Sequence, residues 1–142
     1  MKTFTKIAAL GIFTIFGFGA YAEQVNLSTM FKDKKENEYA FSKKYSDKEL
    51  TFDAIVDSID SKCYTKYLED RMENIPCAKL NAPDVKVGFW GLEMPIASAL
   101  MENPDDLLNL KKKQKIQLTC KLSSGILWDL SSLNFNDCKI NE

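Results

Sequence analysis

The sequence predicts a mainly β fold, namely a small Greek-key barrel of five strands. We expect a helix in front of the strands and a short helical insert between the third and fourth strands. Three observations lead to this prediction. Several stretches alternate apolar and polar residues, one N-terminal stretch has the three- and four-residue spacing of a helix, and turn-forming residues separate the stretches. An antiparallel α+β sandwich would contain a similar set of elements and is the alternative fold.

The composition is that of an ordinary globular domain. The chain has 142 residues, of which 45% are hydrophobic and 27% are charged, with a formal net charge of −1. These values exclude a disordered or collagen-like chain. The sequence has no histidine. This excludes Ser-His-Asp and Cys-His catalysis, as well as metal sites built on histidine.

The first 22 residues have the pattern of an export signal. Lys2 and Lys6 precede an uncharged apolar stretch, and Ala20-Tyr21-Ala22 supplies the small residues of a signal peptidase site. The apolar stretch is shorter than the ~20 residues that span a bilayer. We therefore expect cleavage after Ala22 and no stable membrane insertion of the mature chain. Residues 23–142 would then form a single domain in the periplasm or outside the cell, without the cysteine that a lipid anchor needs at the cleavage point.

All four cysteines lie in the predicted mature chain: Cys63, Cys77, Cys120 and Cys138. An even number of cysteines in an oxidising compartment predicts two disulfides, for which the sequence allows three pairings. A zinc site would normally contain cysteines two to four residues apart, and no two cysteines here are that close. We therefore predict disulfides and no metal.

The N-terminal helix is predicted over residues 27–45, because apolar side chains recur there at helical spacing. Ser28 and Thr29 are the candidates for its N-terminal cap. From Leu50 the period changes to two, so residues 50–57 predict a half-buried strand. The small Ala54 in the middle of this strand suggests a bulge or a tight bend.

The remaining elements are predicted from shorter patterns, in which apolar alternation marks strands and Asn, Pro, Gly and Ser mark turns. In chain order they are a polar turn over 57–62, a second strand Cys63–Leu68, an irregular polar segment 69–83, a third strand Val85–Trp90, a short helix Ile96–Glu102, a helical turn capped by Asp105 or Asp106, a fourth strand Gln114–Leu122, a turn at 123–125 and a last, bulged strand Leu130–Ile140.

Three parts of the chain carry a resemblance to a known family. The run from Tyr45 to Ile59, preceded by Asn37 and Ala40, resembles the opening of the tRNA-anticodon-like OB-fold family, which consists of small exported bacterial proteins without an assigned role. The run from Leu110 to Ile116 resembles the start of that family's fourth strand. Cys120 and the run from Asp137 to Ile140 resemble its closing, cysteine-bearing strands.

The resemblance implies a five-stranded OB-fold and a disulfide pairing. Cys120 and Cys138 would lie on the neighbouring fourth and fifth strands, and Cys63 and Cys77 would join the second strand to the loop after it. Ala54 and Lys113 differ from the family, because glycine is expected at both positions. Glycine there would supply a positive φ or a close backbone approach.

Aromatic and basic side chains are the candidate ligand-binding residues: Trp90, Trp128, Tyr64 and Lys66. Loops at the mouth of an OB-fold commonly contact its ligands. A tryptophan displayed there would anchor a protein or a sugar, whereas one folded over the core would be structural. We predict no catalytic residue, because no pair of carboxylates has a spacing specific to a glycosidase. We also predict no cofactor, because no calcium loop, phosphate-binding loop or dinucleotide motif occurs.

The sequence thus predicts an exported, non-catalytic binding protein whose partner is an envelope protein or a glycan. An inhibitor or immunity-type protein of a lytic enzyme is one alternative. A single-stranded nucleic-acid-binding module is another, disfavoured by export and by the slightly acidic charge of the chain.

Overall fold

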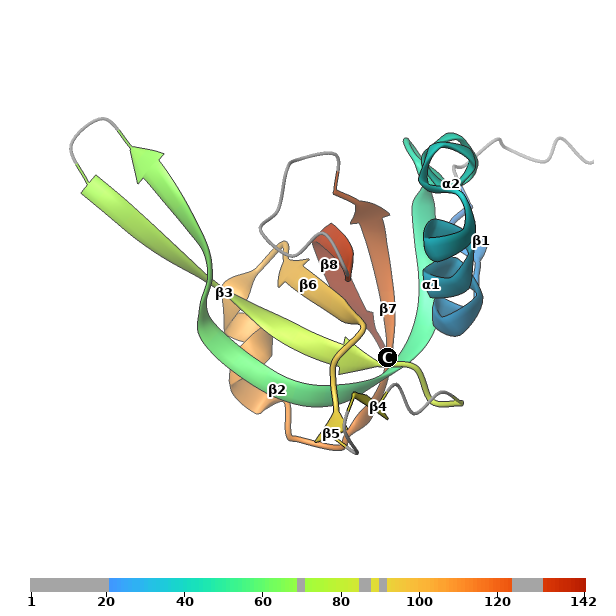
Figure 1. Cartoon of the computed structure of the whole chain (residues 1–142). Helices are drawn as coiled ribbons and strands as arrows, with labels where there is room; N and C mark the ends of the chain where they lie inside the picture. Colours follow the sequence, from blue (N-terminus) through green and yellow to red (C-terminus); the bar gives the residue numbers. More distant parts are fainter. Residues whose placement is uncertain (1–20, 69–70, 85–87, 90–91, 124–131) are drawn as a thin grey trace, which may run out of the picture.

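The computed structural model describes residues 21–68, 71–84, 88–89, 92–123 and 132–142 (Figure 1). For residues 64–68, 71–72, 88–89 and 92–93 it describes the backbone alone. Apart from Tyr21 and Ala22, the predicted export signal lies outside the described residues. The elements are β1 (Glu23–Gln24), α1 (Leu27–Glu36), α2 (Glu38–Tyr45), β2 (Glu49–Leu68), β3 (Arg71–Asn81), β4 (Gly88–Phe89), β5 (Leu92–Glu93), β6 (Ala97–Met101), η1 (Pro104–Asn109), β7 (Lys115–Leu122) and β8 (Leu133–Asn141).

The described chain is mainly β, and its main sheet has six strands in the order β1-β2-β3-β6-β8-β7. Strand β2 also pairs with β7, so five strands are connected in a ring of pairings, β2-β3-β6-β8-β7-β2. Within this ring only β6 and β8 run parallel. The alternative fold, an antiparallel sandwich, would require every pair of strands to be antiparallel, and this sheet does not meet that requirement.

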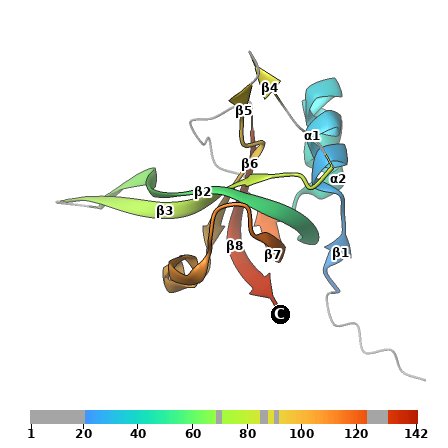
Figure 2. The ribbon, with the colours of Figure 1, turned by 90° about the horizontal axis from the view of Figure 1, so that it is seen from below.

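Strand β2 can join both sides of the ring because it is long and curved (Figures 1 and 2). Its first part, Glu49–Ile55, pairs with β7, and its later part pairs with β3 from Ile55 onward. The register shifts between Val56 and Ser58, where one partner strand gives way to the other. Such a β-bulge bends a strand and increases its twist. The predicted bend thus lies just after Ala54, between Val56 and Ser58, because Ala54 itself pairs regularly with Ile116.

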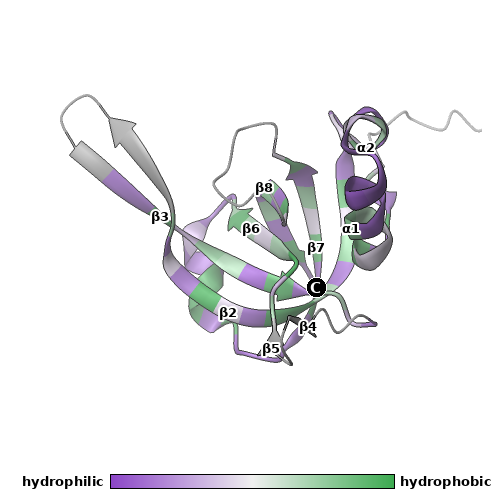
Figure 3. Cartoon of the chain, in the orientation of Figure 1, coloured by the Kyte–Doolittle hydropathy of each residue, from purple (hydrophilic) through white to green (hydrophobic). Residues whose placement is uncertain are grey.

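The core lies inside this ring and is built by the predicted alternation. Leu50, Phe52, Ala54 and Val56 are fully buried, and so is Leu118 of β7. Figure 3 shows the result as hydrophobic positions that alternate with hydrophilic ones along the strands. Side chains of successive strand residues point to opposite faces. The sequence prediction of these two strands is therefore confirmed.

The single helix predicted over 27–45 is wrong, because the chain forms two helices that meet at Asn37. Asn37 has an extended backbone, and its side-chain oxygen accepts a hydrogen bond from the Ala40 N–H at 3.0 Å. Asparagine favours such caps because its side chain satisfies an otherwise unpaired donor of the first turn. Asn26, rather than Ser28 or Thr29, caps α1 in the same way. The break lets both helices bury apolar side chains in the core: Leu27, Met30, Phe41 and Tyr45.

The predicted polar turn at 57–62 is also wrong, because β2 continues without interruption from Glu49 to Leu68. Its polar residues are compatible with a strand that is partly exposed, and no glycine, proline or asparagine interrupts them. The segment 69–83, predicted to be irregular, contains strand β3. Pro76 is tolerated there because it lies between the pairs Asp60–Cys77 and Tyr64–Ile75, where the regular pairing is broken.

Strand β6 replaces the short helix predicted over Ile96–Glu102. It lies between β3 and β8 and buries every second residue, so the neighbouring strands override the local helix propensity. The helical turn is a 3₁₀ helix, η1, capped by Asn103 instead of Asp105 or Asp106. Of the predicted third strand Val85–Trp90, the described residues Gly88–Phe89 form β4, which pairs with β5 outside the main sheet.

Two disulfides join the strands, with the pairing that the family resemblance implied. Cys120 on β7 bonds to Cys138 on β8, and we call this the ring disulfide. Cys63 on β2 bonds to Cys77 on β3, and we call this the arm disulfide. The last strand is bulged as predicted, since the register shifts between Thr119 and Lys121 and Asp137 has φ 49°.

Replacing Lys113 with glycine should stabilise the protein. Lys113 has φ 68° in the turn before β7, where its N–H donates to the Val56 carbonyl at 2.7 Å. This left-handed backbone costs a residue with a Cβ roughly 1–2 kcal/mol. Part of the gain is offset by the greater freedom of glycine in the unfolded chain. We expect Lys113→Gly to raise the free energy of unfolding by about 0.5–1 kcal/mol in urea titrations.

The matched control is Lys112→Gly, because Lys112 is also exposed but does not have a positive φ. That substitution should lower the free energy of unfolding by a few tenths to about 1 kcal/mol. Equal losses in the two variants would contradict the assignment of backbone strain to Lys113.

Candidate functional site

The four residues predicted to bind a ligand are only partly placed by the structure. Trp90 and Trp128 lie outside the described residues. Tyr64 and Lys66 lie in β2, opposite Ile75 and Glu73 of β3, and only their backbone is described. The structure thus brings Tyr64 and Lys66 onto one strand, two residues apart, and their predicted roles remain predictions.

Tyr64 and Lys66 belong to a two-stranded extension of the sheet, which we call the arm. It consists of Tyr64–Leu68 of β2 and Arg71–Ile75 of β3, which pair with each other in regular register. Among the described residues, no other strand pairs with the arm. Figures 1 and 2 both show it extending away from the rest of the molecule. The arm disulfide lies at its base, because Cys63 directly precedes the arm on β2 and Cys77 follows it on β3.

Next to the base of the arm, a polar row crosses the outer surface of β3, β6 and β8. Lys79 is opposite Ser98, and Ser98 is opposite Asn134. All three are partly exposed, whereas their neighbours Leu80, Ala99 and Leu133 point into the core. We call Lys79, Ser98 and Asn134 the outer row.

Lys79 is the charged member of the outer row. Its Nζ donates a hydrogen bond to Ser98 Oγ at 2.9 Å, and it forms no ion pair with any described carboxylate. An ammonium group carries three donors, and one hydroxyl uses only one of them. Lys79 can therefore donate to an oxygen atom of a ligand without first breaking an ion pair.

Sequence reasoning missed Lys79 because the whole segment 69–83 was predicted to be irregular. The sequence pattern that could have identified Lys79 as a strand residue is short. Ala78, Leu80 and Ala82 alternate with Lys79 and Asn81, and this pattern is typical of a half-buried strand. Pro76 and Pro83 on either side hid it, since both were interpreted as breakers.

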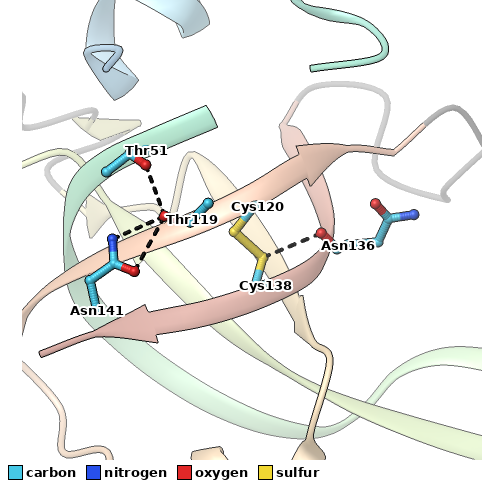
Figure 4. Close-up of a disulfide and its surroundings, with 6 residues drawn as sticks. All are labelled: Thr51, Thr119, Cys120, Asn136, Cys138 and Asn141. Carbon is cyan, nitrogen blue, oxygen red and sulfur yellow. Dashed lines mark hydrogen bonds between the residues drawn. A yellow bond between two sulfur atoms is a disulfide. The ribbon is translucent and has the colours of Figure 1, made fainter. Parts of the chain in front are cut away.

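The surface formed by β2, β7 and β8 is different, because its polar side chains bond to one another (Figure 4). Thr51 Oγ1 and Thr119 Oγ1 are 2.8 Å apart, and Asn141 Nδ2 donates to Thr119 Oγ1 at 3.0 Å. Gln117 continues the network, donating to Asp53 and accepting from Asn141. These contacts join three strands across their outer surface. Cross-strand pairs of this kind stabilise a sheet, so we interpret the network as structural.

The pKa shifts resolved among the described residues lie between the two helices. Asp33 accepts a hydrogen bond from the Tyr45 hydroxyl at 2.7 Å and forms an ion pair with Lys44 at 3.2 Å. The hydrogen bond from Tyr45, followed by that from Lys44, lowers the pKa of the Asp33 carboxyl below its usual value. Burial, followed by the bond to Asp33, raises the pKa of Tyr45. These contacts join α1 to α2. No described side chain beside them suggests a catalytic role for Asp33 or Tyr45.

Acid should therefore weaken the junction of the two helices. Because folding lowers the pKa of Asp33, its ionised form stabilises the protein above the unfolded-state pKa. This contribution is lost as the pH falls through the still lower folded-state pKa. We expect Asp33→Asn, which keeps an acceptor for Tyr45, to be less stable than the parent at pH 7. The difference should shrink when urea titrations are repeated below about pH 4.

Tyr45→Phe is the control for this prediction. It removes the hydrogen bond that contributes most to the shift and keeps the ring, which packs against Phe41 with centroids 5.0 Å apart. In this background the pH-dependent part of the Asp33→Asn effect should be smaller. A difference between parent and Asp33→Asn that stays constant with pH would contradict the assignment.

The described residues contain neither a candidate metal centre nor a candidate membrane span. No group of three or more His, Cys, Asp or Glu side chains within them is placed to hold an ion. No helix in the same part of the chain is long and apolar enough to cross a bilayer.

Comparison with known proteins shows that the fold of this chain is similar to that of a solved structure. No family model and no curated protein matches the sequence. A solved structure with a similar fold is that of a protein from Klebsiella pneumoniae subsp. pneumoniae MGH 78578, which carries the description "putative nucleic acid-binding lipoprotein". The two chains are 10% identical, and the superposition, with a TM-score of 0.61, covers 85% of this chain and 92% of the other. At this identity the similarity shows a common fold and nothing about the ligand.

Proposed function

We propose that this chain is an exported, non-catalytic binding protein with an OB-fold, and that its outer row contacts the ligand. The observation that carries this proposal is Lys79, an ammonium group without a described carboxylate partner on a sheet surface beside a projecting arm. Such a surface offers hydrogen bonds and charge to a ligand.

The ring of pairings supports the OB-fold. An OB-fold is a five-stranded Greek-key barrel, partly open, whose second and third strands and adjacent loops face the ligand. Counted from β2, the ring has five strands, with the helical turn η1 between the third (β6) and the fourth (β7). The outer row then starts on the second and third strands, β3 and β6. The family resemblance of the sequence implies the same fold.

The two disulfides support export. Disulfides form and persist in oxidising compartments and are rare in the cytosol of most organisms. The Klebsiella protein of similar fold is described as a lipoprotein. The basic and apolar start of this chain and the small residues at Ala20 and Ala22 are those of a cleavable export signal. We therefore propose the periplasm or the extracellular space as the location.

An envelope protein or a glycan is the partner that we propose. Both present hydroxyl, carbonyl and carboxylate oxygens that an ammonium and a serine hydroxyl can bind. If the partner is a lytic enzyme, the protein would act as its inhibitor, which is the alternative within this class.

The experiment is a quantitative pull-down from solubilised cell envelope with the purified protein as bait. Lys79→Ala should reduce the recovery of the specific partner or of bound glycan by about tenfold, as expected when one charged contact worth roughly 1.4 kcal/mol is lost. Lys32→Ala is the matched control, because Lys32 on α1 is exposed and its ion pair among the described residues is with Glu36 on its own helix. Equal capture by the parent and Lys79→Ala would place the binding surface elsewhere, and capture of nothing by the parent would contradict the proposal.

Single-stranded nucleic acid is the second candidate, and the description of the Klebsiella protein favours it. Binding to phosphates releases counterions, so its affinity falls steeply with salt. Fluorescence anisotropy with a labelled thymidine oligonucleotide at low salt tests this candidate directly. A salt-dependent increase that Lys79→Ala weakens would support nucleic acid over a protein or a glycan. An unchanged signal at low salt would remove it.

A further inference from the structure

The two disulfides differ in their access to solvent. Cys63 of the arm disulfide is partly exposed, while its partner Cys77 is fully buried. Both members of the ring disulfide, Cys120 and Cys138, are buried with at most 1% of their surface exposed. A reductant has to reach a sulfur atom before thiol–disulfide exchange can begin. Under native conditions it can therefore reach Cys63 long before it reaches the ring disulfide.

The arm disulfide bridges the place where the pairing of β2 and β3 is broken. Regular pairs stop at Asp60–Cys77 and start again at Tyr64–Ile75. Three residues of β2 but only Pro76 of β3 lie in this gap, and proline has no N–H to donate to a partner strand. The covalent bond thus joins the strands where their hydrogen-bond ladder is interrupted.

Beyond this gap, no third strand among the described residues pairs with the arm. Its described strands pair only with each other, and a two-stranded hairpin on its own is marginally stable in water. The ring, in contrast, has the core inside it and its own disulfide between β7 and β8. Loss of the arm disulfide should therefore loosen the arm and leave the ring folded.

We propose that the arm disulfide is a redox-sensitive switch that a dithiol reductant opens selectively. A thiolate of the reductant attacks Sγ of Cys63, forms a mixed disulfide and displaces the Cys77 thiolate, which takes up a proton. The second thiol of the reductant then attacks the mixed disulfide and releases Cys63 as a thiol. Two electrons and two protons pass to the protein, and the reductant leaves as a disulfide. The inference concerns the order of the arm and does not depend on which ligand the outer row binds.

Timed reduction of the native, fully oxidised protein with dithiothreitol tests the switch. Free thiols are trapped by alkylation and located by peptide mass mapping, and trypsin is added in parallel to probe Lys62, Lys66 and Arg71 in or beside the arm. We expect Cys63 and Cys77 to be alkylated at least about tenfold faster than Cys120 and Cys138. Cleavage at the three sites should increase over the same period, while the near-ultraviolet circular dichroism of the folded core persists.

Two results would overturn the proposal. One is alkylation of all four cysteines at the same rate, which would mean that reduction occurs through global unfolding. The other is selective reduction of Cys63 and Cys77 without any increase in cleavage of the arm. Binding by the outer row enters neither readout, so failure here leaves the proposed function to be tested separately.

A pair of double variants supplies the matched control. Cys63→Ser with Cys77→Ser should be cleaved in the arm without reductant, at the rate of the reduced parent. Cys120→Ser with Cys138→Ser should keep the slow cleavage of the oxidised parent in the arm under conditions where it is folded. Faster cleavage of the arm in the second variant than in the first would contradict the assignment of the switch to Cys63 and Cys77.

Discussion

Phe135→Ala should destabilise the protein by about 3–5 kcal/mol, a large part of the 5–15 kcal/mol that is typical of a domain. Phe135 on β8 and Phe52 on β2 are both fully buried, and their ring centroids are 4.6 Å apart. These two strands do not pair with each other, because β7 lies between them on one side and β3 and β6 on the other. The contact therefore crosses the interior of the ring, and removing one phenyl leaves a cavity there. Urea titration monitored by circular dichroism measures the loss.

The control for Phe135→Ala is Leu108→Ala on η1, because Leu108 is 80% exposed. Its effect should stay within about 0.5 kcal/mol. A double-mutant cycle with Phe52→Leu and Phe135→Leu should give a coupling energy of about 0.5–1.5 kcal/mol, which is usual for an aromatic pair. Additive effects of the two substitutions would show that β2 and β8 do not meet inside a ring.

Removing the ring disulfide should lower the free energy of unfolding by at least about 3 kcal/mol. Cys120 and Cys138 close a loop with a sequence separation of 18, and in the loop-entropy model a loop of this size gives about 3 kcal/mol. Both residues also belong to the buried set, so the variant Cys120→Ala with Cys138→Ala loses packing as well. Urea titration of this double variant measures the sum of these effects.

Removing the arm disulfide is the comparison for removing the ring disulfide, since Cys63 and Cys77 have a similar sequence separation of 14. The entropic effect on the unfolded chain is therefore nearly the same for the two disulfides. Without its disulfide, however, the arm can loosen while the ring stays folded, and this freedom also favours the native state. We expect Cys63→Ala with Cys77→Ala to lose less than about 2 kcal/mol. A larger loss than in the ring variant would contradict the independence of the arm.

Strands with a long alternating pattern could be predicted from the sequence, whereas β3 and β6, whose patterns are short or weak, were missed. In β7, Ile116, Leu118 and Cys120 alternate with polar residues, so local pattern and burial agree. In β6, alanine and serine are as compatible with a helix as with a strand, and only pairing with β3 and β8 decides between them. The cap at Asn37 was overlooked because the apolar spacing continues across it.

The outer row could not be predicted from the sequence, because it also depends on the pairing of strands. Lys79, Ser98 and Asn134 are brought together only by the register of three strands that are distant in the chain. No local pattern encodes that register, and two of the three strands were predicted as irregular chain or helix. Tyr64 and Lys66 were correctly assigned to a strand, but the length of that strand and its projection as an arm come from pairing with β3.

The most direct test of the proposed binding role is the two-dimensional ¹H–¹⁵N NMR spectrum of the isotope-labelled protein, recorded before and after addition of unlabelled envelope extract. Only the labelled chain is observed, so the partner need not be known. We expect shifts or loss of intensity at the amides of Lys79, Ser98 and Asn134 and along the base of the arm, and much weaker changes in the Lys79→Ala variant. Changes confined to the helices or to the outer surface of β2 and β7, or a spectrum that does not change, would contradict a binding protein that acts through the outer row.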